Sequence, residues 1–299
     1  MLSPGTGSAG QTPGESLRSL LQHGGLLLPG VFNAITARAA ERAGYSALYL
    51  SGAGVTNSLT AFPDIALITL SEMAAQARYV CRAASCPVLA DADTGYGDAL
   101  NVARAVEELE HAGLAGIHLE DQVAPKRCGH LDGKQVIEPV EMARKIRAAV
   151  KARANPAFVI VARTDTRSVN GLQDAIDRGR RCQDAGADAL FPESLQSEEE
   201  FAAFAEAVHV PVIANMTEFG KTPLIPAARF FQLGCSAVLF PMTAFRVMMK
   251  AATALYTDLK ATGTQAAWIG SMQTRAELYE MIGYADFESF DREIAEEIP

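Results

Sequence analysis

The segment EHAGLAGIHL at residues 110–119 carries the pattern on which the fold prediction depends. A helical stretch ends at a glycine, and a short, largely apolar run follows. The same phrase recurs as ERAGYSALYL at 41–50, QDAGADALFP at 183–192 and QLGCSAVLF at 232–240. Glycine often ends a helix, and continuous apolar runs are typical of strands buried on both faces of a parallel sheet. The recurrence therefore predicts a repeated helix–turn–strand joint.

Similar joints can be followed along most of the chain. Eight short apolar runs predict strands at Leu26–Pro29, Ala47–Leu50, Pro87–Ala90, Gly116–Leu119, Phe158–Ala162, Ala189–Phe191, Val212–Ala214 and Ala237–Phe240. Between them, helices are predicted at Ala34–Ala43, Ser71–Ala83, Ala99–Ala112, Pro139–Arg153, Leu172–Ala185, Ser197–Val208 and Thr243–Ala261. Alternation of strands and helices predicts an α/β fold with a parallel sheet.

Such a sheet is either open and doubly wound or closed into a barrel. No GxGxxG follows the first strand and no P-loop is present, so the signatures of an open nucleotide-binding sheet are missing. Polar residues of different chemistry follow the strands instead, and in a barrel they converge on the carboxyl-terminal rim. We therefore predict a (β/α)8 TIM-type barrel, with a site built from Ser51, Asp91, Asp93, Glu120, Arg163, Asp165, Glu193 and Asn215.

Bulk composition fits one such domain. The chain has 299 residues and 49% hydrophobic residues, and a barrel typically needs about 250 residues. We predict a flexible tail rich in Gly, Ser, Thr and Pro over residues 1–16, with a single domain over 17–299. A net charge of −9 argues against binding to nucleic acids or anionic membranes. No apolar run reaches 18 residues, and five cysteines do not suggest a disulfide framework, so we expect a cytoplasmic location.

Two aspartates at the end of the third strand suggest a metal site. Asp91 and Asp93 lie two residues apart, and on a strand such side chains point to the same face. Adjacent carboxylates repel each other unless a cation lies between them, although Asp93 could instead begin a turn and cap the next helix. Glu120 adds a third carboxylate at the next strand end. An all-oxygen set favours Mg²⁺, with Mn²⁺ as the alternative.

The loop KRCGH at 126–130 predicts acid–base chemistry. Cys128 follows Lys126 and Arg127, and positive neighbours lower the pKa of a thiol. Gly129 and Gly133 permit loop motion, and loops after barrel strands often cover a substrate. The alternative is a surface loop in which the cysteine is incidental.

Arginine and histidine residues at strand ends and on helices have structural as well as functional explanations. Arg163 ends a buried strand, where an unpaired guanidinium is costly, so it needs an anionic partner, and Asp165 is a structural candidate. Arg246 lies on the predicted helix Thr243–Ala261, where an arginine is usually solvated, and residue spacing alone assigns no role to Arg275. His118 lies inside a strand and is expected to be a hydrogen-bonding residue of the core.

The ordered motifs YLSGAGV, FPD, DADTGYG, HLEDQ, KRCGH, ARTD, FPE, ANMTEFG, FPMTAFR and MQTRAELYE resemble those of the isocitrate lyase / phosphoenolpyruvate mutase superfamily. The resemblance extends from about Pro29 to Tyr284. KRCGH is similar to the lyase branch, in particular the 2-methylisocitrate lyases, whereas the phosphonomutase branch lacks that cysteine.

The resemblance implies roles for individual residues. It places Mg²⁺ on Asp91, Asp93 and Glu120, supported by Asp64. Cys128 is the implied acid, with Lys126 and His130 beside it and Tyr49 or a metal-bound hydroxide as base. The implied substrate contacts are Ser51, Gly52, Ala53, Cys128, Gly129, Arg163, Glu193, Asn215, Met216, Thr217, Arg246 and Arg275. Family members often carry glycine where Ala53 stands, and a methyl group there could narrow the pocket.

The implied activity is cleavage of 2-methylisocitrate to pyruvate and succinate, a step of the 2-methylcitrate cycle in propionate catabolism. The resemblance also implies a homotetramer in which a carboxyl-terminal arm, from about residue 243 to 299, is swapped between subunits. A 2,3-dimethylmalate lyase and an oxaloacetate decarboxylase or hydrolase remain alternatives among enzymes. A catalytically silent barrel used as a scaffold is the alternative outside them, and it need not bind Mg²⁺.

Overall fold

The computed structural model describes residues 10–127, 129–130 and 133–296. Eight parallel strands form a sheet in the order β6-β5-β4-β3-β2-β1-β8-β7. A bridge between Leu190 and Val212 joins the two outer strands. The sheet is therefore a nearly closed barrel, as predicted, made of β1 (Leu26–Val31), β2 (Leu48–Leu50), β3 (Val88–Asp91), β4 (Gly116–Glu120), β5 (Val159–Thr164), β6 (Ala189–Pro192), β7 (Ile213–Asn215) and β8 (Ala237–Phe240).

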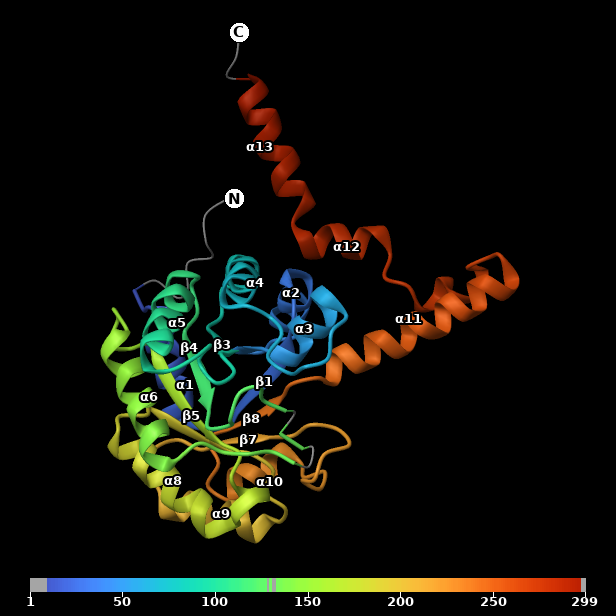
Figure 1. Cartoon of the computed structure of the whole chain (residues 1–299). Coiled ribbons are helices and arrows are strands. Elements are labelled where there is room, and N and C mark those ends of the chain that lie inside the picture. The colour runs from blue at the N-terminus through green and yellow to red at the C-terminus, as the bar shows by residue number, and fades with distance from the viewer. Residues whose placement is uncertain (1–9, 128, 131–132, 297–299) are drawn as a thin grey trace.

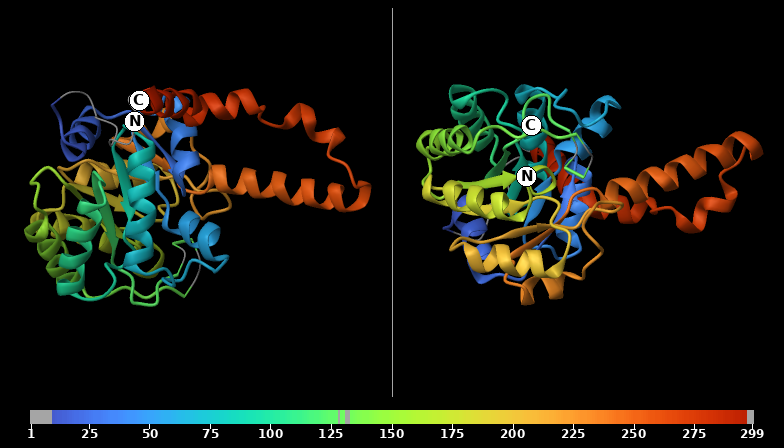
Figure 2. Two further views of the ribbon diagram at one scale, coloured as in Figure 1. Left: turned by 90° about the horizontal axis from the view of Figure 1, so that it is seen from above. Right: turned by 60° about the horizontal axis from the view of Figure 1, so that its bottom comes forward.

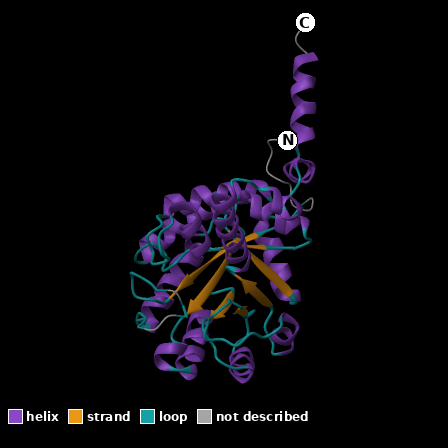
Figure 3. Ribbon diagram, turned by 90° about the vertical axis from the view of Figure 1, so that its right-hand side faces the viewer, coloured by secondary structure: helices purple, strands orange, loops and turns teal. Residues whose placement is uncertain are grey.

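Helices surround this barrel (Figures 1 and 3). Their starts follow the predicted caps: the Thr69 hydroxyl accepts a hydrogen bond from Glu72 N, and Asp98 accepts one from Ala99 N. The helices along the barrel are α2 (Ala34–Arg42), α3 (Gly52–Thr60), α4 (Leu70–Ala83), α5 (Ala99–His111), α6 (Pro139–Ala152), α7 (Arg167–Asn170), α8 (Leu172–Asp184), α9 (Glu198–Ala207) and α10 (Ala227–Gln232).

Strand alternation decides which side chains enter the barrel. Val159 and Val161 of β5 belong to an inner cluster of buried residues, whereas Ile160 and Ala162 belong to the outer cluster beneath the helices. Successive side chains of a strand point to opposite faces, so Arg163 continues the inward series of β5. The same parity applies to the other strands. By this alternation, the following side chains point into the barrel: Ser51 after β2, Asp91 in β3, Glu120 in β4, Glu193 after β6 and Asn215 in β7.

The amino-terminal segment corrects one prediction. We expected a flexible tail through Ser16, but α1 begins at Pro13 and extends to His23. Thr12 and Glu15 form a capping box, and Leu17 and Leu21 are buried with the inner barrel residues. The Gly- and Ser-rich composition concealed this signal, although the Thr12-to-Glu15 spacing was present. Residues 1–9 lie outside the described residues.

After β8 the chain leaves the barrel as an arm (Figures 1 and 2). The arm consists of α11 (Thr243–Thr262), a 3-10 helix (Ala266–Ser271), α12 (Arg275–Ile282) and α13 (Tyr284–Glu296). Arg38 and Arg42 of α2 each donate a hydrogen bond to a carbonyl at the end of α12. Within the described residues, no helix is long and apolar enough to cross a membrane. The assignment of residues 17–299 to one domain stays a prediction.

Candidate active site

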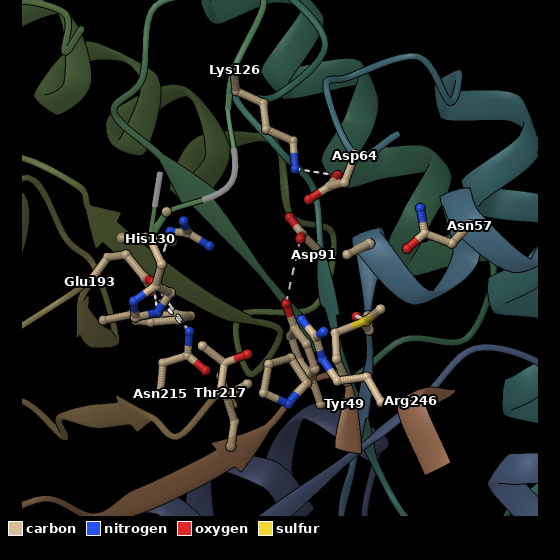
Figure 4. A pocket seen from close by; sticks show the side chains of 18 residues that line it. Tyr49, Asn57, Asp64, Asp91, Lys126, His130, Glu193, Asn215, Thr217 and Arg246 are labelled. Atoms are coloured by element: carbon tan, nitrogen blue, oxygen red, sulfur yellow. Dashed lines mark hydrogen bonds and ion pairs between the residues drawn. The ribbon is translucent and has the colours of Figure 1, made fainter. Parts of the chain in front are cut away.

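A cavity of about 190 Å³ opens at the carboxyl ends of the strands (Figure 4). This is the rim where the sequence predicted convergence. The predicted residues that line it are Tyr49, Ser51, Ala53, Asp64, Asp91, Lys126, Gly129, His130, Arg163, Glu193, Asn215, Thr217 and Arg246. They come from strand ends and loops far apart in the chain, so the closed barrel brings them together.

One side of the cavity adjoins an acidic cluster, which we define as Asp64, Asp91, Asp93 and Glu120. Asp64 and Asp91 line the cavity, whereas Asp93 and Glu120 are buried and do not line it. Asp93 lies beyond β3 at φ 47°, so the strand-face argument that placed it beside Asp91 was wrong. The two residues are neighbours for another reason: Asp93 N donates a 2.9 Å hydrogen bond to Asp91 Oδ1. Burial raises the pKa of Asp93 to about 6, with Lys126 opposing it.

Glu120 is the least compensated member of the acidic cluster. Its side chain is fully buried, and neither carboxylate oxygen has a hydrogen-bond partner. The Arg163 Nε atom lies 3.3 Å from Oε2, but burial still raises the pKa of Glu120 well above its usual value. The charges of Arg163 and Lys126 therefore do not offset the burial of this carboxylate.

Lys126 supplies a cation to this cluster. Its buried Nζ lies 2.5 Å from Asp64 Oδ1 and 2.9 Å from Asp93 Oδ1. Burial lowers the pKa of Lys126, but the surrounding carboxylates outweigh that effect and raise it well above its usual value. Lys126 therefore stays protonated and balances the acidic cluster, as Figure 4 shows for its contact with Asp64.

The acidic cluster has the chemistry of a magnesium site. Within the described residues, no three acidic, cysteine or histidine side chains are grouped closely enough to hold an ion by themselves. Mg²⁺ usually keeps several waters and needs one or two protein carboxylates, so a closed cage is not required. Both carboxylate oxygens of Glu120 lack hydrogen-bond partners, so the cluster has acceptor oxygens for a further cation beside Lys126. The donor set fits this ion.

Tyr49 and His118 lie beneath the acidic cluster. Tyr49 Oη is 2.8 Å from His118 Nε2, and it donates a 3.5 Å hydrogen bond to Asp91 Oδ2. Burial, with the charge of Asp91, raises the pKa of Tyr49 well above 10. Burial lowers the pKa of His118 to about 4, so its ring is neutral. These shifts favour a hydrogen-bonding role for Tyr49 over the role of a base, and His118 is the core residue that we predicted.

Another side of the cavity adjoins a paired cluster, which we define as Arg163, Asp165, Glu193, Asn215 and His130. Arg163 donates to Asp165 through Nε at 2.9 Å and through Nη2 at 3.1 Å. This two-point pairing confirms Asp165 as the anionic partner. The guanidinium also lies 5.1 Å from the Phe191 ring centroid. Arg163 is thus held rigidly at the cavity wall.

Both carboxylate oxygens of Glu193 have partners. Asn215 Nδ2 donates to its two oxygens at 3.3 and 3.1 Å, and His130 Nε2 lies 2.7 Å from Oε1. His130 Nδ1 accepts a hydrogen bond from Lys221 N, so the ring proton is on Nε2. Burial alone would raise the pKa of Glu193, but Arg163 and His130 hold it below its usual range. His130 therefore connects its loop to the barrel.

The first turn of α3 forms another wall of the cavity. Ser51 caps this helix, and its hydroxyl accepts from Gly54 N at 3.1 Å. A side-chain carbon on Gly52 would lie 2.6 Å from Asp91 Oδ2, so glycine lets the helix start against the acidic cluster. The amide groups of a helix amino terminus attract anions. Ala53 lines the cavity beside them.

Several predicted residues lie elsewhere. Cys128 is outside the described residues. Met216 is buried in the outer core and does not line the cavity, because Asn215 and Thr217, on either side of it, face inward. Arg275 is exposed at the start of α12 and lies on the arm. Arg246 does line the cavity from α11, with Nε 3.3 Å from Glu218 Oε2.

Sequence reasoning missed the apolar wall of the cavity. This wall contains Phe191, Leu239, Pro241 and Met242, together with the polar residue Asn57 nearby. Phe191 and Leu239 were inside predicted strands, and strand parity would have identified them as inward. These two side chains are apolar, so the polarity of strand ends does not identify them.

Comparison with known proteins agrees with this architecture. The family described as phosphoenolpyruvate phosphomutase matches residues 17–260. A 2-methylisocitrate lyase from Aeropyrum pernix is 49% identical over 286 residues, which cover 95% of this chain and 92% of that protein.

Solved structures give the same result. The structure of 2,3-dimethylmalate lyase, described as a member of the PEP mutase/isocitrate lyase superfamily, has a TM-score of 0.89 and 35% identity. The matched region covers 95% of this chain and 96% of the 2,3-dimethylmalate lyase chain. A phosphonopyruvate hydrolase in complex with oxalate and Mg²⁺ has a TM-score of 0.85 and 27% identity, with 94% and 99% covered.

Proposed function

This chain belongs to the phosphoenolpyruvate mutase/isocitrate lyase superfamily, and from that premise we propose that it is a carbon–carbon lyase that cleaves 2-methylisocitrate to pyruvate and succinate. The observation that carries the choice of substrate is the 49% identity to a 2-methylisocitrate lyase over 95% of the chain. This reaction would place the protein in the 2-methylcitrate cycle of propionate catabolism.

The cavity supports a small polycarboxylate as ligand. The amide groups at the start of α3, the Ser51 hydroxyl and Arg163 offer hydrogen bonds to carboxylates on different walls. The apolar wall of Phe191, Leu239 and Pro241 offers contact to a methyl substituent. A ligand that combines several carboxylates with a small apolar group suits these surfaces.

The acidic cluster would hold Mg²⁺ through Asp91 and Asp93, with Glu120 and Asp64 as partners of its water ligands. Bound there, the ion would polarise the substrate hydroxyl and the neighbouring carboxylate and lower the pKa of that hydroxyl. The phosphonopyruvate hydrolase structure, which contains Mg²⁺, supports a divalent ion in this family. Mn²⁺ has the same ligand preferences and is the alternative.

Residues of the chain would then transfer protons, stabilise charge and orient the substrate. A base, for which the resemblance leaves Tyr49 or a hydroxide as candidates, accepts the hydroxyl proton, and the electron pair of the breaking carbon–carbon bond moves onto the departing carboxylate fragment. Arg163 stabilises the negative charge that develops there, because it is preorganised by Asp165. Cys128 donates its proton to the carbon of that fragment and yields succinate. Glu193, Asn215 and Thr217 orient the substrate.

The arm supports assembly of several copies. Its exposed apolar residues include Val247 and Tyr256 on α11, Ile269 in the 3-10 helix and Phe287 on α13. Apolar residues at this density commonly mark a protein interface. We infer a homotetramer with swapped arms, in which Arg275 reaches the cavity of a neighbouring subunit. Light scattering coupled to size exclusion tests the assembly, and a monomer would contradict it.

The function is tested by a substrate panel. The protein with Mg²⁺ is incubated with 2-methylisocitrate, isocitrate, 2,3-dimethylmalate and oxaloacetate, and release of the 2-oxo acid or other product is followed. We expect the highest kcat/KM for 2-methylisocitrate, with pyruvate and succinate as products. A higher value for dimethylmalate or oxaloacetate would assign the chain to that activity instead.

The role of Cys128 is tested by Cys128→Ser. Positioned proton transfer typically contributes about 10²–10⁴-fold, so turnover should fall by at least that order while Mg²⁺ binding and the unfolding temperature stay unchanged. Cys235→Ser, which alters a buried cysteine away from the cavity, is the matched control. Near-normal turnover of the Cys128 variant would exclude the acid role.

A further inference from the structure

Lys134 has contacts that the proposed reaction does not yet use. Its side chain is buried, and Nζ lies 2.9 Å from Asp165 Oδ1. The same ammonium donates a hydrogen bond to the carbonyl oxygen of Gly129. Lys134 thus joins the loop that follows β4 to the residue that pairs with Arg163.

Gly129 is in direct contact with the cavity residues. A side-chain carbon built on it would lie 2.5 Å from Arg163 Nη2 and 2.6 Å from Glu193 Cγ. The backbone of Gly129 therefore packs on both groups without room for any larger residue. A displacement of this carbonyl would move the loop backbone relative to Arg163 and Glu193.

The ends of the loop are fixed by other interactions. Val123 N donates to Gln135 O and Ile137 N donates to Asp121 O, both at 2.8 Å, so the two ends pair with each other. Between these ends, side chains connect Gly129 to the barrel. The carbonyl oxygen of Gly129 accepts a hydrogen bond from Lys134 Nζ and another from the Ser194 hydroxyl at 2.8 Å.

Asp165 connects the two contacts of Lys134. Its Oδ1 accepts from Lys134 and from Arg163 Nη2, while its main-chain N–H donates to Asp121 Oδ1 at 2.8 Å. Asp121 in turn accepts from Arg178 of α8 at 3.2 Å. Asp165 is thus oriented from the barrel side, and it can serve as a fixed point from which Lys134 positions Gly129.

We propose that Lys134 is a positioning residue for the proposed lyase reaction: it holds the carbonyl of Gly129 at a fixed distance from Asp165 and keeps the loop backbone against Arg163 and Glu193. This inference rests on the proposed function. Misplacement by about 1 Å can cost on the order of 10²-fold in rate, even when substrate still binds. Lys134 therefore acts on kcat through the positions of other groups.

The test compares Lys134→Met with Lys134→Arg, which keeps the charge. Arg153→Met is the matched control. Arg153 Nη1 forms a half-buried ion pair with Asp188 Oδ2 at 2.6 Å, but it also donates to Phe158 O, at the amino end of β5 and away from the cavity. Each full-length variant is assayed for kcat and KM with 2-methylisocitrate and Mg²⁺. Amide hydrogen exchange is measured over residues 122–137 and over the barrel strands.

We expect Lys134→Met to lower kcat about 10- to 100-fold with little change in KM. Exchange should become faster in residues 122–137 alone, and Lys134→Arg should recover much of both losses. Arg153→Met should keep its kcat even if its unfolding temperature falls. An unchanged kcat in Lys134→Met, or faster exchange throughout the barrel with no recovery by arginine, would overturn the proposal.

Failure of the proposed function gives a different result. If wild type turns over no substrate of the panel, the lyase assignment fails, and exchange alone then decides the positioning role. Faster exchange confined to residues 122–137 in Lys134→Met, with recovery in Lys134→Arg, would support that role. Unchanged exchange there would exclude it.

Discussion

The acidic cluster and the paired cluster adjoin one cavity and meet where Arg163 Nε lies 3.3 Å from Glu120 Oε2, but they differ in how their charges are satisfied. Glu120 is buried with both carboxylate oxygens lacking hydrogen bonds, whereas Glu193 accepts from Asn215 and lies 2.7 Å from His130. Burial raises the pKa of Glu120 more than Arg163 lowers it, whereas at Glu193 the effects of Arg163 and His130 outweigh burial and lower the pKa. Two buried glutamates at the same rim are therefore in opposite electrostatic states.

This electrostatic difference suits the two clusters to different functions at the same rim of the barrel. A cluster with excess negative charge is prepared to receive a cation from outside the chain. A cluster whose groups already pair with one another is rigid and needs no reorganisation when charge develops on a ligand. The first side is suited to metal binding and the second to orientation of an anionic substrate.

The largest effect is expected from removing Arg163. Arg163→Met leaves Asp165, Glu120 and Glu193 without a shared cation, and breaking a buried ion pair typically costs about 3–5 kcal/mol. Urea unfolding measures this loss, and Arg163→Lys should lose less because it retains the charge. A loss below about 1 kcal/mol would show that the paired cluster is not held together by this arginine.

A smaller effect is expected from adding Mg²⁺. An ion that binds the folded state alone stabilises it by about 2.7 kcal/mol at one hundred times its Kd. We expect this increase in wild type and in Glu193→Gln, and its loss in Asp91→Asn. Thermal unfolding in EDTA and in Mg²⁺ provides the measurement. Stabilisation that persists in Asp91→Asn would remove the acidic cluster as the metal site.

The smallest effects, and the sharpest comparison, come from Glu120→Gln and Glu193→Gln without metal. A carboxyl whose pKa is raised by folding opposes stability when charged at pH 7, so neutral glutamine at 120 should stabilise by on the order of 1 kcal/mol.

The substitution Glu193→Gln should change stability in the opposite direction. Because folding lowers the pKa of Glu193, this carboxylate stabilises the folded state at pH values above its pKa in the unfolded chain. Glutamine at 193 should therefore destabilise the protein by on the order of 1 kcal/mol at pH 7. Unfolding in EDTA at pH 7 measures both variants. Changes of the same sign in the two would contradict the distinction between the clusters.

Much of the fold was predictable because its signals are local. Gly113 marks a helix end, the run from Gly116 is buried on both faces, and Thr69 and Asp98 begin helices as caps. The helix at Pro13 was missed although Thr12 and Glu15 have capping-box spacing. Strand-end polarity likewise located Ser51, Asp91, Arg163, Glu193 and Asn215 of the cavity, because parallel strands bring their carboxyl ends to one rim. Other lining residues, such as Ala53, Asp64 and Gly129, were implied only by the family resemblance.

The sequence by itself determined the alternating pattern and the list of polar strand ends, because each depends on residues close together in the chain. The barrel was predicted from the expected convergence of those strand ends, whereas its closure depends on the distant pairing of β1 with β8. Only the tertiary structure decided the partners. Asp93 turns at a positive φ, Lys126 lies between Asp64 and Asp93, and Lys134 reaches Asp165 across 31 positions of sequence. Electrostatic energy depends on distance in space and on burial, and neither quantity is encoded in the spacing of residues along one strand.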